Sequence, residues 1–114
     1  MADCIFCKII EGRIPSQKVY EDDDLFAFED IQPAAPVHVV LIPKKHIETF
    51  NDIAEDDSDA LGRLMLTARK IAIDRKLAKD GYRIVLNCMA GAGQSVFHIH
   101  FHLLGGRIFT WPPG

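Results

Sequence analysis

The chain has 114 residues, of which 48 % are apolar and 25 % are charged, and its formal net charge is −3. This composition excludes a disordered or collagen-like chain, and the length predicts one domain over residues 1–114. The negative charge and the lack of a long apolar run lead us to expect no sequence-specific nucleic-acid partner and no membrane partner. Three cysteines, an odd number, and a start without a secretory segment favour a reducing, cytoplasmic location.

The first half of the chain predicts one helix and three strands. Apolar residues at positions 5, 6, 9 and 10 indicate a short helix over Cys4–Glu11. Strands over Lys18–Glu21 and Leu25–Glu29 flank three aspartates, which favours a hairpin with a solvated turn rather than a metal site. Val37–Ile42, bounded by prolines, predicts a third strand, on which His38 shares a face with the residues two and four positions later.

The second half predicts a long helix followed by two strands. Asp56, Asp57, Ser58 and Asp59 mark the start of the helix, and apolar residues then recur at steps of three and four to about Lys79, just before Gly81. Tyr82–Asn87 and Phe97–Leu104 predict the remaining strands. Because one long and one short helix accompany a run of strands, we predict an α+β fold with a mostly antiparallel sheet.

Three histidines, His98, His100 and His102, alternate with apolar residues in the last predicted strand. Side chains alternate along a strand, so these three are expected to line one face about 6.5–7 Å apart. Buried imidazoles that served packing alone would each need hydrogen-bond partners, and the pattern therefore favours a function. Two functions stay open on this evidence: a metal site, and catalysis by an imidazole whose ordinary pKa of about 6.5 suits neutral pH.

The loop just before the histidines has the residues of an anion site. Gly91 and Gly93 let backbone N–H groups approach an anion closely, and the Ser95 hydroxyl adds a donor. Because this loop directly precedes the histidines, it indicates a phosphate oxyanion held beside an imidazole nucleophile.

The histidine run has the form His-x-His-x-His-x-x with apolar residues at x, and it resembles the signature of the histidine triad (HIT) superfamily. Other segments resemble its Hint branch, the histidine triad nucleotide-binding proteins: Phe28-Glu29-Asp30-Ile31, Pro36-Val37-His38, Ile42-Pro43-Lys44-Lys45-His46, Gly93-Gln94-Ser95-Val96, Gly105-Gly106-Arg107 and Trp111-Pro112-Pro113-Gly114. The resemblance covers nearly the whole chain. It implies a single HIT domain over residues 1–114, with a five-stranded antiparallel sheet that continues across a homodimer.

The resemblance also implies an activity, hydrolysis of purine nucleoside 5′-phosphoramidates to a nucleoside monophosphate and an amine. The nucleophile of the family corresponds to His100, which would form a covalent nucleotidyl–histidine, and the chemistry needs no cofactor. His38 corresponds to a histidine that orients the triad. The nucleotide-binding residues of the family correspond to Asp30 at the ribose, Ile31 at the base, and Asn87, Gly93, Gln94, Ser95, His100 and His102 at the phosphate, with Phe6, Ile9, Phe28 and Val40 as weaker candidates at the base.

The pair Cys4 and Cys7 supplies half of the four ligands that zinc requires. A thioredoxin-like role fits poorly because no strand precedes the pair. Some triad proteins that this chain resembles complete the tetrahedron with two histidines, which correspond to His46 and His98. The resemblance thus implies a structural zinc site at Cys4, Cys7, His46 and His98. Other Hint-type proteins lack the cysteines, so occupancy stays open.

Three alternatives to the phosphoramidase remain. The first is hydrolysis of dinucleoside polyphosphates, as in the Fhit-like branch of the superfamily. The second is a non-catalytic nucleotide- or zinc-binding module that regulates a partner. The third is metal-dependent catalysis at the three histidines.

Overall fold

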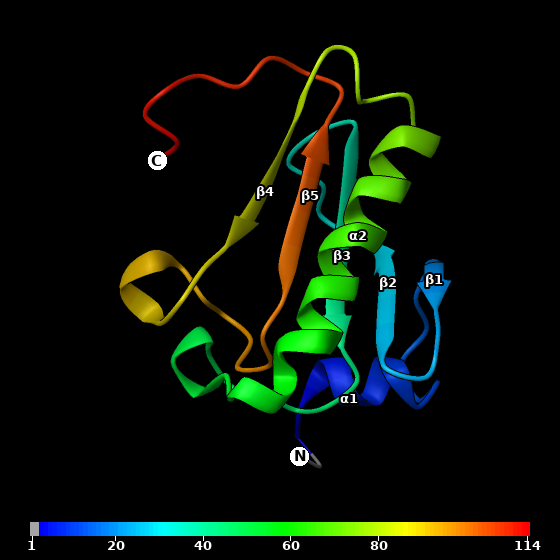
Figure 1. The fold of residues 1–114 in the computed structure, drawn as a ribbon, viewed down its shortest axis with the longest axis vertical. Coiled ribbons are helices and arrows are strands. Elements are labelled where there is room, and N and C mark those ends of the chain that lie inside the picture. Colours follow the sequence, from blue (N-terminus) through cyan, green and yellow to red (C-terminus); the bar gives the residue numbers. More distant parts are fainter. Residues whose placement is uncertain (1–2) are drawn as a thin grey trace.

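A five-stranded antiparallel sheet with strand order β1-β2-β3-β5-β4 organises residues 3–114, the part of the chain that the computed structural model describes. This confirms the predicted α+β class (Figure 1). The elements are α1 (Ile5–Ile10), β1 (Lys18–Glu21), β2 (Leu25–Glu29), β3 (Val37–Pro43), α2 (Ser58–Asp74), β4 (Tyr82–Leu86) and β5 (Phe101–Gly105), with 3-10 turns at Phe50–Asp52, Glu55–Asp57 and Ala90–Ala92.

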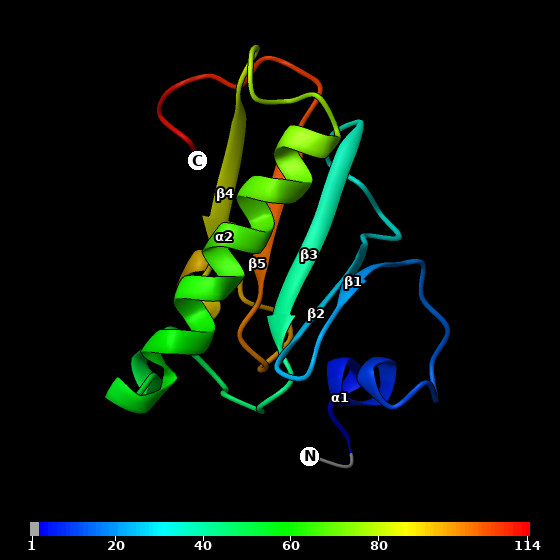
Figure 2. The same ribbon diagram turned by 45° about the vertical axis from the view of Figure 1, so that its right-hand side comes forward.

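The two faces of the sheet are covered by different helices. On one face, α2 buries its apolar stripe in a cluster that includes Leu64, Ala68, Val39 and Leu103. We call this the α2 cluster, and the cluster on the opposite face the α1 cluster. On the other, α1 contributes to a second cluster made of Phe6, Ile9, Phe26, Phe28, Val40 and Ile42. Figure 2 shows α2 running along the sheet and α1 on its opposite side. Alternating residues of β2 and β3 therefore supply both clusters, and the histidines share the face that α1 covers.

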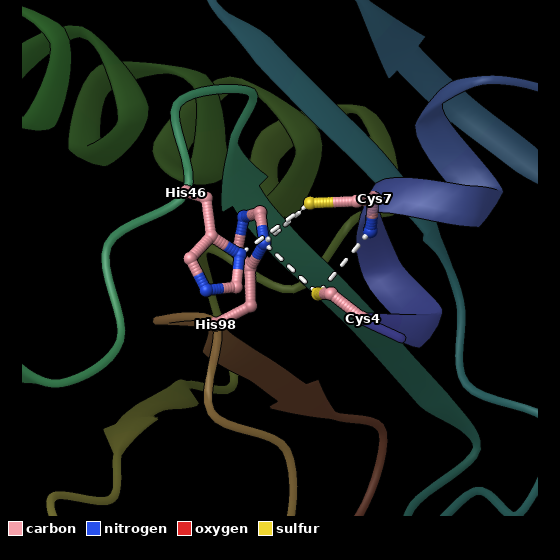
Figure 3. Close-up of side chains that lie close together, drawn as sticks. All are labelled: Cys4, Cys7, His46 and His98. Carbon is pink, nitrogen blue, oxygen red and sulfur yellow. Dashed lines mark hydrogen bonds between the residues drawn. The ribbon is translucent and has the colours of Figure 1, made fainter. Parts of the chain in front are cut away.

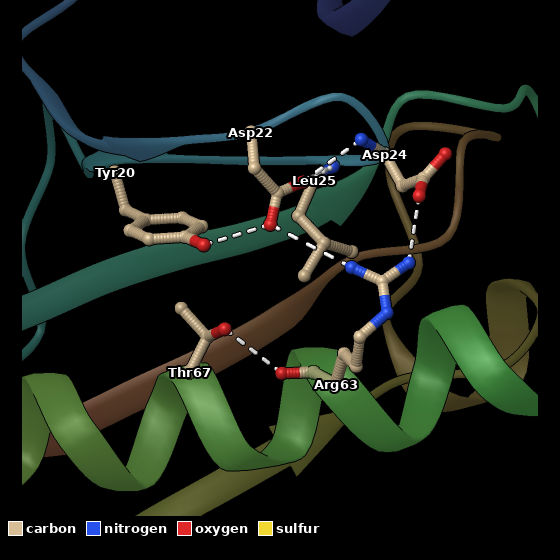
Figure 4. A network of polar contacts seen from close by, with 6 residues as sticks. All are labelled: Tyr20, Asp22, Asp24, Leu25, Arg63 and Thr67. Atoms are coloured by element: carbon tan, nitrogen blue, oxygen red, sulfur yellow. Dashed lines mark hydrogen bonds and ion pairs between the residues drawn. The ribbon is translucent and has the colours of Figure 1, made fainter.

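The predicted hairpin is confirmed, but its acidic turn is not simply solvated. One oxygen of Asp22 accepts hydrogen bonds from the backbone N–H groups of Asp24 and Leu25 at 2.8 Å, and the other accepts from the Tyr20 hydroxyl at 2.7 Å. Arg63 of α2 contacts both Asp22, at 3.6 Å, and Asp24, at 2.7 Å (Figure 4). The turn is thus tied to the long helix.

The long helix ends at Asp74 rather than at about Lys79, so its predicted end is wrong. Lys76 takes a left-handed conformation, with φ 62°, and its N–H donates to the Ile73 carbonyl. The next N–H, that of Leu77, donates to Ala72, and Leu77 then packs into the α2 cluster. This Schellman ending uses lysine where glycine is usual, so no sequence signal marked it. Of the helices described, none combines the length and hydropathy needed to cross a bilayer.

The last strand begins at Phe101, four residues later than predicted, and this correction changes the triad. Residues 97 and 98 form a bend, and residues 99 and 100 also lie outside the ladder. The His98 ring turns aside toward Pro43, whose carbonyl accepts from Nε2 at 2.7 Å. The prediction of three histidines on one continuous strand is therefore wrong, and only His102 lies within β5. The side chains in this segment still alternate between the two faces, because Ile99 and Phe101 pack in the α2 cluster.

Candidate active site

The hydrogen bonds of His100 leave one ring nitrogen with a free lone pair. Its Nδ1 lies 2.9 Å from the carbonyl oxygen of His98, which can only accept, so Nδ1 carries the proton. In the neutral ring, Nε2 then has the lone pair. The ring is buried and meets the Phe6 ring edge-on at 5.0 Å between centroids, and the His102 ring at the same distance. A neutral, oriented imidazole of this kind is suited to nucleophilic attack.

A second series of hydrogen bonds determines which ring nitrogen of His102 carries the proton. The backbone N–H of Ala34 donates to His38 Nδ1 at 3.0 Å, which leaves the His38 proton on Nε2. That nitrogen lies 2.8 Å from His102 Nδ1, the nearest acceptor. His102 Nδ1 therefore accepts, and His102 Nε2 carries an N–H that can be donated to a ligand. The sequence predicted that His38 orients the triad, but the direct contact between the two rings was not foreseen.

The environment keeps these rings neutral near pH 7. Burial lowers the pKa of His100, although the His98 carbonyl and Asp30 oppose the effect. Burial also lowers the pKa of His102, to about 4, with further contributions from His100 and His38. The pKa of His38 is lowered by burial as well, against the attraction of Asp30. A neutral imidazole is the nucleophilic form, so the pocket favours the reactive state.

Asp30 and Ile31 lie where β2 ends, beside the histidines. One Asp30 oxygen accepts from the Gln32 N–H at 2.8 Å, and the other lies 3.4 Å from His38 Nε2. Ile31 is 91 % exposed, so its side chain is free to contact a ligand. Both residues line a cavity of about 480 Å³ together with residues 15–17 and Glu29. The weaker base-contact candidates Phe6, Ile9, Phe28 and Val40 are buried in the α1 cluster, where they pack.

The loop before the triad forms hydrogen bonds between its own backbone groups, which the sequence did not indicate. The N–H groups of Gly93 and Gln94 donate to the carbonyls of Ala90 and Met89, so a phosphate would have to share these donors. The Gln94 side chain is buried. Its oxygen accepts from the Met89 N–H at 2.8 Å, and its nitrogen donates to the Glu48 carbonyl at 2.7 Å and to Val96. Gln94 thus holds the loop in place, a role that no sequence signal indicated.

Ser95 and Asn87 remain the side chains of this region available to a ligand. Ser95 is exposed and follows Gln94 directly. Asn87 is half-buried and follows β4, whose last residue, Leu86, pairs with Phe101 of β5. Asn87 and His100 are the next residues on the two chains, just beyond the end of this pairing.

Cys4, Cys7, His46 and His98 gather although they come from three distant segments (Figure 3). Their candidate ligand atoms all lie within 4.8 Å of one another. His98 Nδ1 is 3.4 Å from Cys4 Sγ and 3.6 Å from Cys7 Sγ, and His46 Nδ1 is 3.4 Å from Cys7 Sγ. Tetrahedral zinc with bonds of about 2.3 Å to sulfur and 2.0–2.1 Å to nitrogen would separate S and N ligands by about 3.5 Å. The donor set and its spacing therefore fit zinc.

The protonation of this cluster is consistent with a metal site. Because His98 Nε2 donates to the Pro43 carbonyl, its Nδ1 has the lone pair that faces the sulfurs. Burial and the neighbouring Cys4 raise the pKa of Cys7 to about 11, so its thiol is protonated in the metal-free chain. A metal would displace that proton, as metals do at thiol ligands.

The fold and the histidine geometry define a histidine triad protein, and comparison with known proteins agrees. The HIT domain family model matches residues 11–108, and the chain belongs to this family. The family resemblance predicted from the sequence is thus confirmed.

Two curated relatives share half of the aligned residues. An uncharacterized HIT-like protein of Synechocystis is 50 % identical over 112 residues, which are 98 % of this chain and 97 % of the relative. The purine nucleoside phosphoramidase of Escherichia coli K12 is 50 % identical over 105 residues, 92 % of this chain and 88 % of the relative.

Solved structures show the same fold. A HIT family hydrolase from Legionella pneumophila is 53 % identical with a TM-score of 0.96, over 98 % of this chain and 100 % of the other. A histidine triad nucleotide-binding protein from Candida albicans is 37 % identical with a TM-score of 0.83, over 96 % of this chain and 83 % of the other.

Proposed function

We propose that the chain is a hydrolase that cleaves the P–N bond of purine nucleoside 5′-phosphoramidates. The observation that carries the proposal is the hydrogen bond from His100 Nδ1 to the His98 carbonyl, because it leaves a lone pair on Nε2 of a neutral, buried ring. The substrate class is supported by the Escherichia coli relative, which is named a purine nucleoside phosphoramidase.

The reaction proceeds in two displacements at the α-phosphorus. His100 Nε2 bonds to phosphorus while the substrate P–N bond breaks, and the nucleotidyl group stays on the ring. The leaving amine takes a proton from solvent, which the attacking water returns in the second step. Water then attacks the same phosphorus, releases the nucleoside monophosphate and regenerates the imidazole. The His102 Nε2–H donates to a non-bridging oxygen, where negative charge develops.

The remaining predicted residues position the nucleotide around this centre. We assign Asp30 to the ribose hydroxyls, since a carboxylate accepts from two donors, and Ile31 to the base. Ser95, Asn87 and the backbone of Gly93 and Gln94 contact the phosphate. His38 does not touch the substrate and acts through His102.

Replacement of the nucleophile tests the proposal. His100→Ala should abolish turnover of adenosine 5′-phosphoramidate, while isothermal titration still detects AMP binding. In the wild-type enzyme, rapid quenching and mass spectrometry should find one AMP group on the peptide that contains His100. Turnover by His100→Ala near the wild-type rate would contradict the assignment of the nucleophile.

The alternatives predict different substrates. A dinucleoside polyphosphate hydrolase would show a higher kcat/KM for diadenosine polyphosphates than for adenosine phosphoramidate. A non-catalytic module would bind AMP without turning over either compound. Loss of activity on chelation without loss of structure would favour metal-dependent catalysis at the histidines instead.

We also propose that Cys4, Cys7, His46 and His98 hold a structural zinc ion. Four protein ligands leave no open position for water, which is typical of a structural site. Zinc, when bound, would join α1 to the segment before β5 and leave His100 and His102 free for the phosphate. Thiolate ligands persist in a reducing compartment, so we retain the cytoplasm as the proposed location.

The third cysteine offers a matched control for the zinc site. Cys7→Ser should lower the zinc content of the purified protein, measured by atomic emission, and lower its Tm. Cys88→Ser changes a half-buried thiol outside the cluster and should change neither. Equal zinc content in the two variants and the wild type would contradict this ligand set.

We further propose a homodimer whose two sheets join edge to edge through β4. In the described part of the chain β4 lies at the edge of the sheet and pairs with β5 alone, and Ile84 on it is 38 % exposed. An open apolar edge of this kind favours pairing with another strand. Ile84→Asp should shift the mass measured by light scattering toward the monomer, whereas Leu66→Asp, on the exposed face of α2, should not. A monomeric wild-type protein would refute the proposal.

A further inference from the structure

The turn that follows β5 holds the loop that leads into the active site. The Arg107 Nε donates to the Ala34 carbonyl at 3.0 Å, across a sequence separation of 73 residues. The same guanidinium donates through Nη1 to the Ile108 carbonyl at 3.2 Å and lies over the Phe109 ring, 4.4 Å from its centroid. Two contacts with the segment after β5 thus fix the Arg107 side chain, and its Nε donates to Ala34.

Ala34 is also the residue whose N–H determines the proton position of two histidines. Its N–H donates to His38 Nδ1, and His38 Nε2 faces His102 Nδ1 at 2.8 Å. The neighbouring Pro36 packs against Gly106, since a Cβ built on that glycine would lie 2.9 Å from the Pro36 Cβ. The loop between Asp30 and Pro36 is therefore held at two adjacent points by the residues after β5.

We propose that Arg107 is a positioning residue for the phosphoramidase reaction: by holding Ala34, it keeps His38 and His102 in the tautomers that present the His102 Nε2–H to the phosphate. This inference rests on the proposed function, because the phosphate is the ligand of that N–H. Arg107 itself touches neither the histidines nor the substrate. Its effect passes from the Ala34 carbonyl through the backbone of that residue to its N–H, and from there by two hydrogen bonds to His38 and His102.

The shape of arginine explains why this residue type serves here. A guanidinium donates in several fixed directions from one plane and also stacks on aromatic rings. Arg107 uses both properties at once, toward Ala34, Ile108 and Phe109. A lysine can reach the Ala34 carbonyl with one donor but cannot keep the planar stack, so it should restore the function only in part.

Arg83 provides a matched control. It also lies over Phe109, 5.1 Å from the ring centroid, and donates to the Thr110 carbonyl at 3.0 Å. This hydrogen bond connects β4 to the segment after β5 and does not involve the loop of Ala34. Removal of Arg83 therefore perturbs the Phe109 stack and leaves the contact with Ala34 in place.

The experiment compares Arg107→Ala, Arg107→Lys and Arg83→Ala with the wild type. Nitrogen-15 NMR of the imidazole rings reports the His102 tautomer, and steady-state kinetics with adenosine 5′-phosphoramidate report kcat and KM. In Arg107→Ala we expect a loss of the His102 Nε2–H signal pattern and a fall in kcat of up to about tenfold, the value of one hydrogen bond. Arg107→Lys should recover part of both, and Arg83→Ala should match the wild type.

An unchanged His102 tautomer in Arg107→Ala would overturn the proposal, as would equal losses in Arg107→Ala and Arg83→Ala. The NMR measurement needs no turnover, so it separates this proposal from the proposed function. If the wild type failed to cleave the phosphoramidate while the tautomer still responded to Arg107→Ala, the function would be wrong and the positioning role would stand.

Discussion

Replacing Gly106 by alanine tests how tightly the turn after β5 packs against the active-site loop. Gly106 has φ +90°, a conformation that costs an L-residue about 1–2 kcal/mol. The new Cβ would also lie 2.9 Å from Pro36 Cβ and 3.2 Å from its Cγ. The proline ring is rigid and cannot rotate away, so overpacking should add about 1–3 kcal/mol. We therefore expect Gly106→Ala to lower the free energy of unfolding by about 2–5 kcal/mol.

Gly93 is a control with nearly the same φ and no neighbour at the position of a Cβ. Its φ is +89°, and nothing lies within 4 Å of a Cβ built there. Gly93→Ala should thus cost only the conformational strain, about 1–2 kcal/mol. Urea denaturation and thermal melting measure both variants, with roughly 4 °C of Tm for each kcal/mol at this chain length. Equal losses in the two variants would refute the reasoning, because the contact with Pro36 would then contribute nothing.

Two further predictions concern the core and the histidines. Leu64→Ala, at a side chain that is 0 % exposed, should cost about 2–5 kcal/mol in urea denaturation, whereas Leu66→Ala on the outer face of the same helix should stay within about 0.5 kcal/mol; similar losses would contradict the assigned faces of α2. Folding lowers the pKa of His102 from 6.5 to about 4. Between pH 6.5 and pH 4, His102 is therefore protonated in the unfolded chain and neutral in the folded chain. The free energy of unfolding should therefore fall as the pH drops from 6.5 toward 4, by roughly 1–2 kcal/mol after allowance for partial solvent screening. Urea denaturation at several pH values should show a shallower dependence in His102→Gln, and an unchanged slope would count against the assignment.

Most of the fold follows from local patterns in the sequence. The strands around the aspartates and Val37–Pro43 agree with prediction because alternation, prolines and turn residues all indicate the same boundaries. The end of α2 was missed because a lysine in the left-handed conformation closes it, and the expected glycine lies seven residues beyond Asp74. That ending is set by the burial of Leu77 in the core, a tertiary effect that periodicity does not report.

The sequence predicts which residues form the candidate site better than it predicts how those residues are arranged. The sequence identifies the histidines, Asp30 and Ser95 as functional candidates, but the pattern could not show that His98 and His100 lie before the strand. Nor could it show that the Gln94 side chain would be buried among backbone groups, since an exposed-looking glutamine in a glycine loop gives no sign of distant partners. Contacts across many residues, such as that of Arg107 with Ala34, are invisible to local patterns.

Because β5 begins only after His100, the three closely spaced histidines make different contacts. On a continuous strand, His98 would face the same ligand as the others, and its carbonyl would belong to the sheet ladder. Because the ladder begins only at Phe101, the His98 ring can join the cysteines while its carbonyl stays free to accept from His100 Nδ1. His102, inside the strand, is instead oriented across the sheet by His38 from β3. His100 and His102, which we propose contact the phosphate, therefore have opposite tautomers, one with a lone pair on Nε2 and one with a proton there. That difference is what a nucleophile and a neighbouring hydrogen-bond donor require.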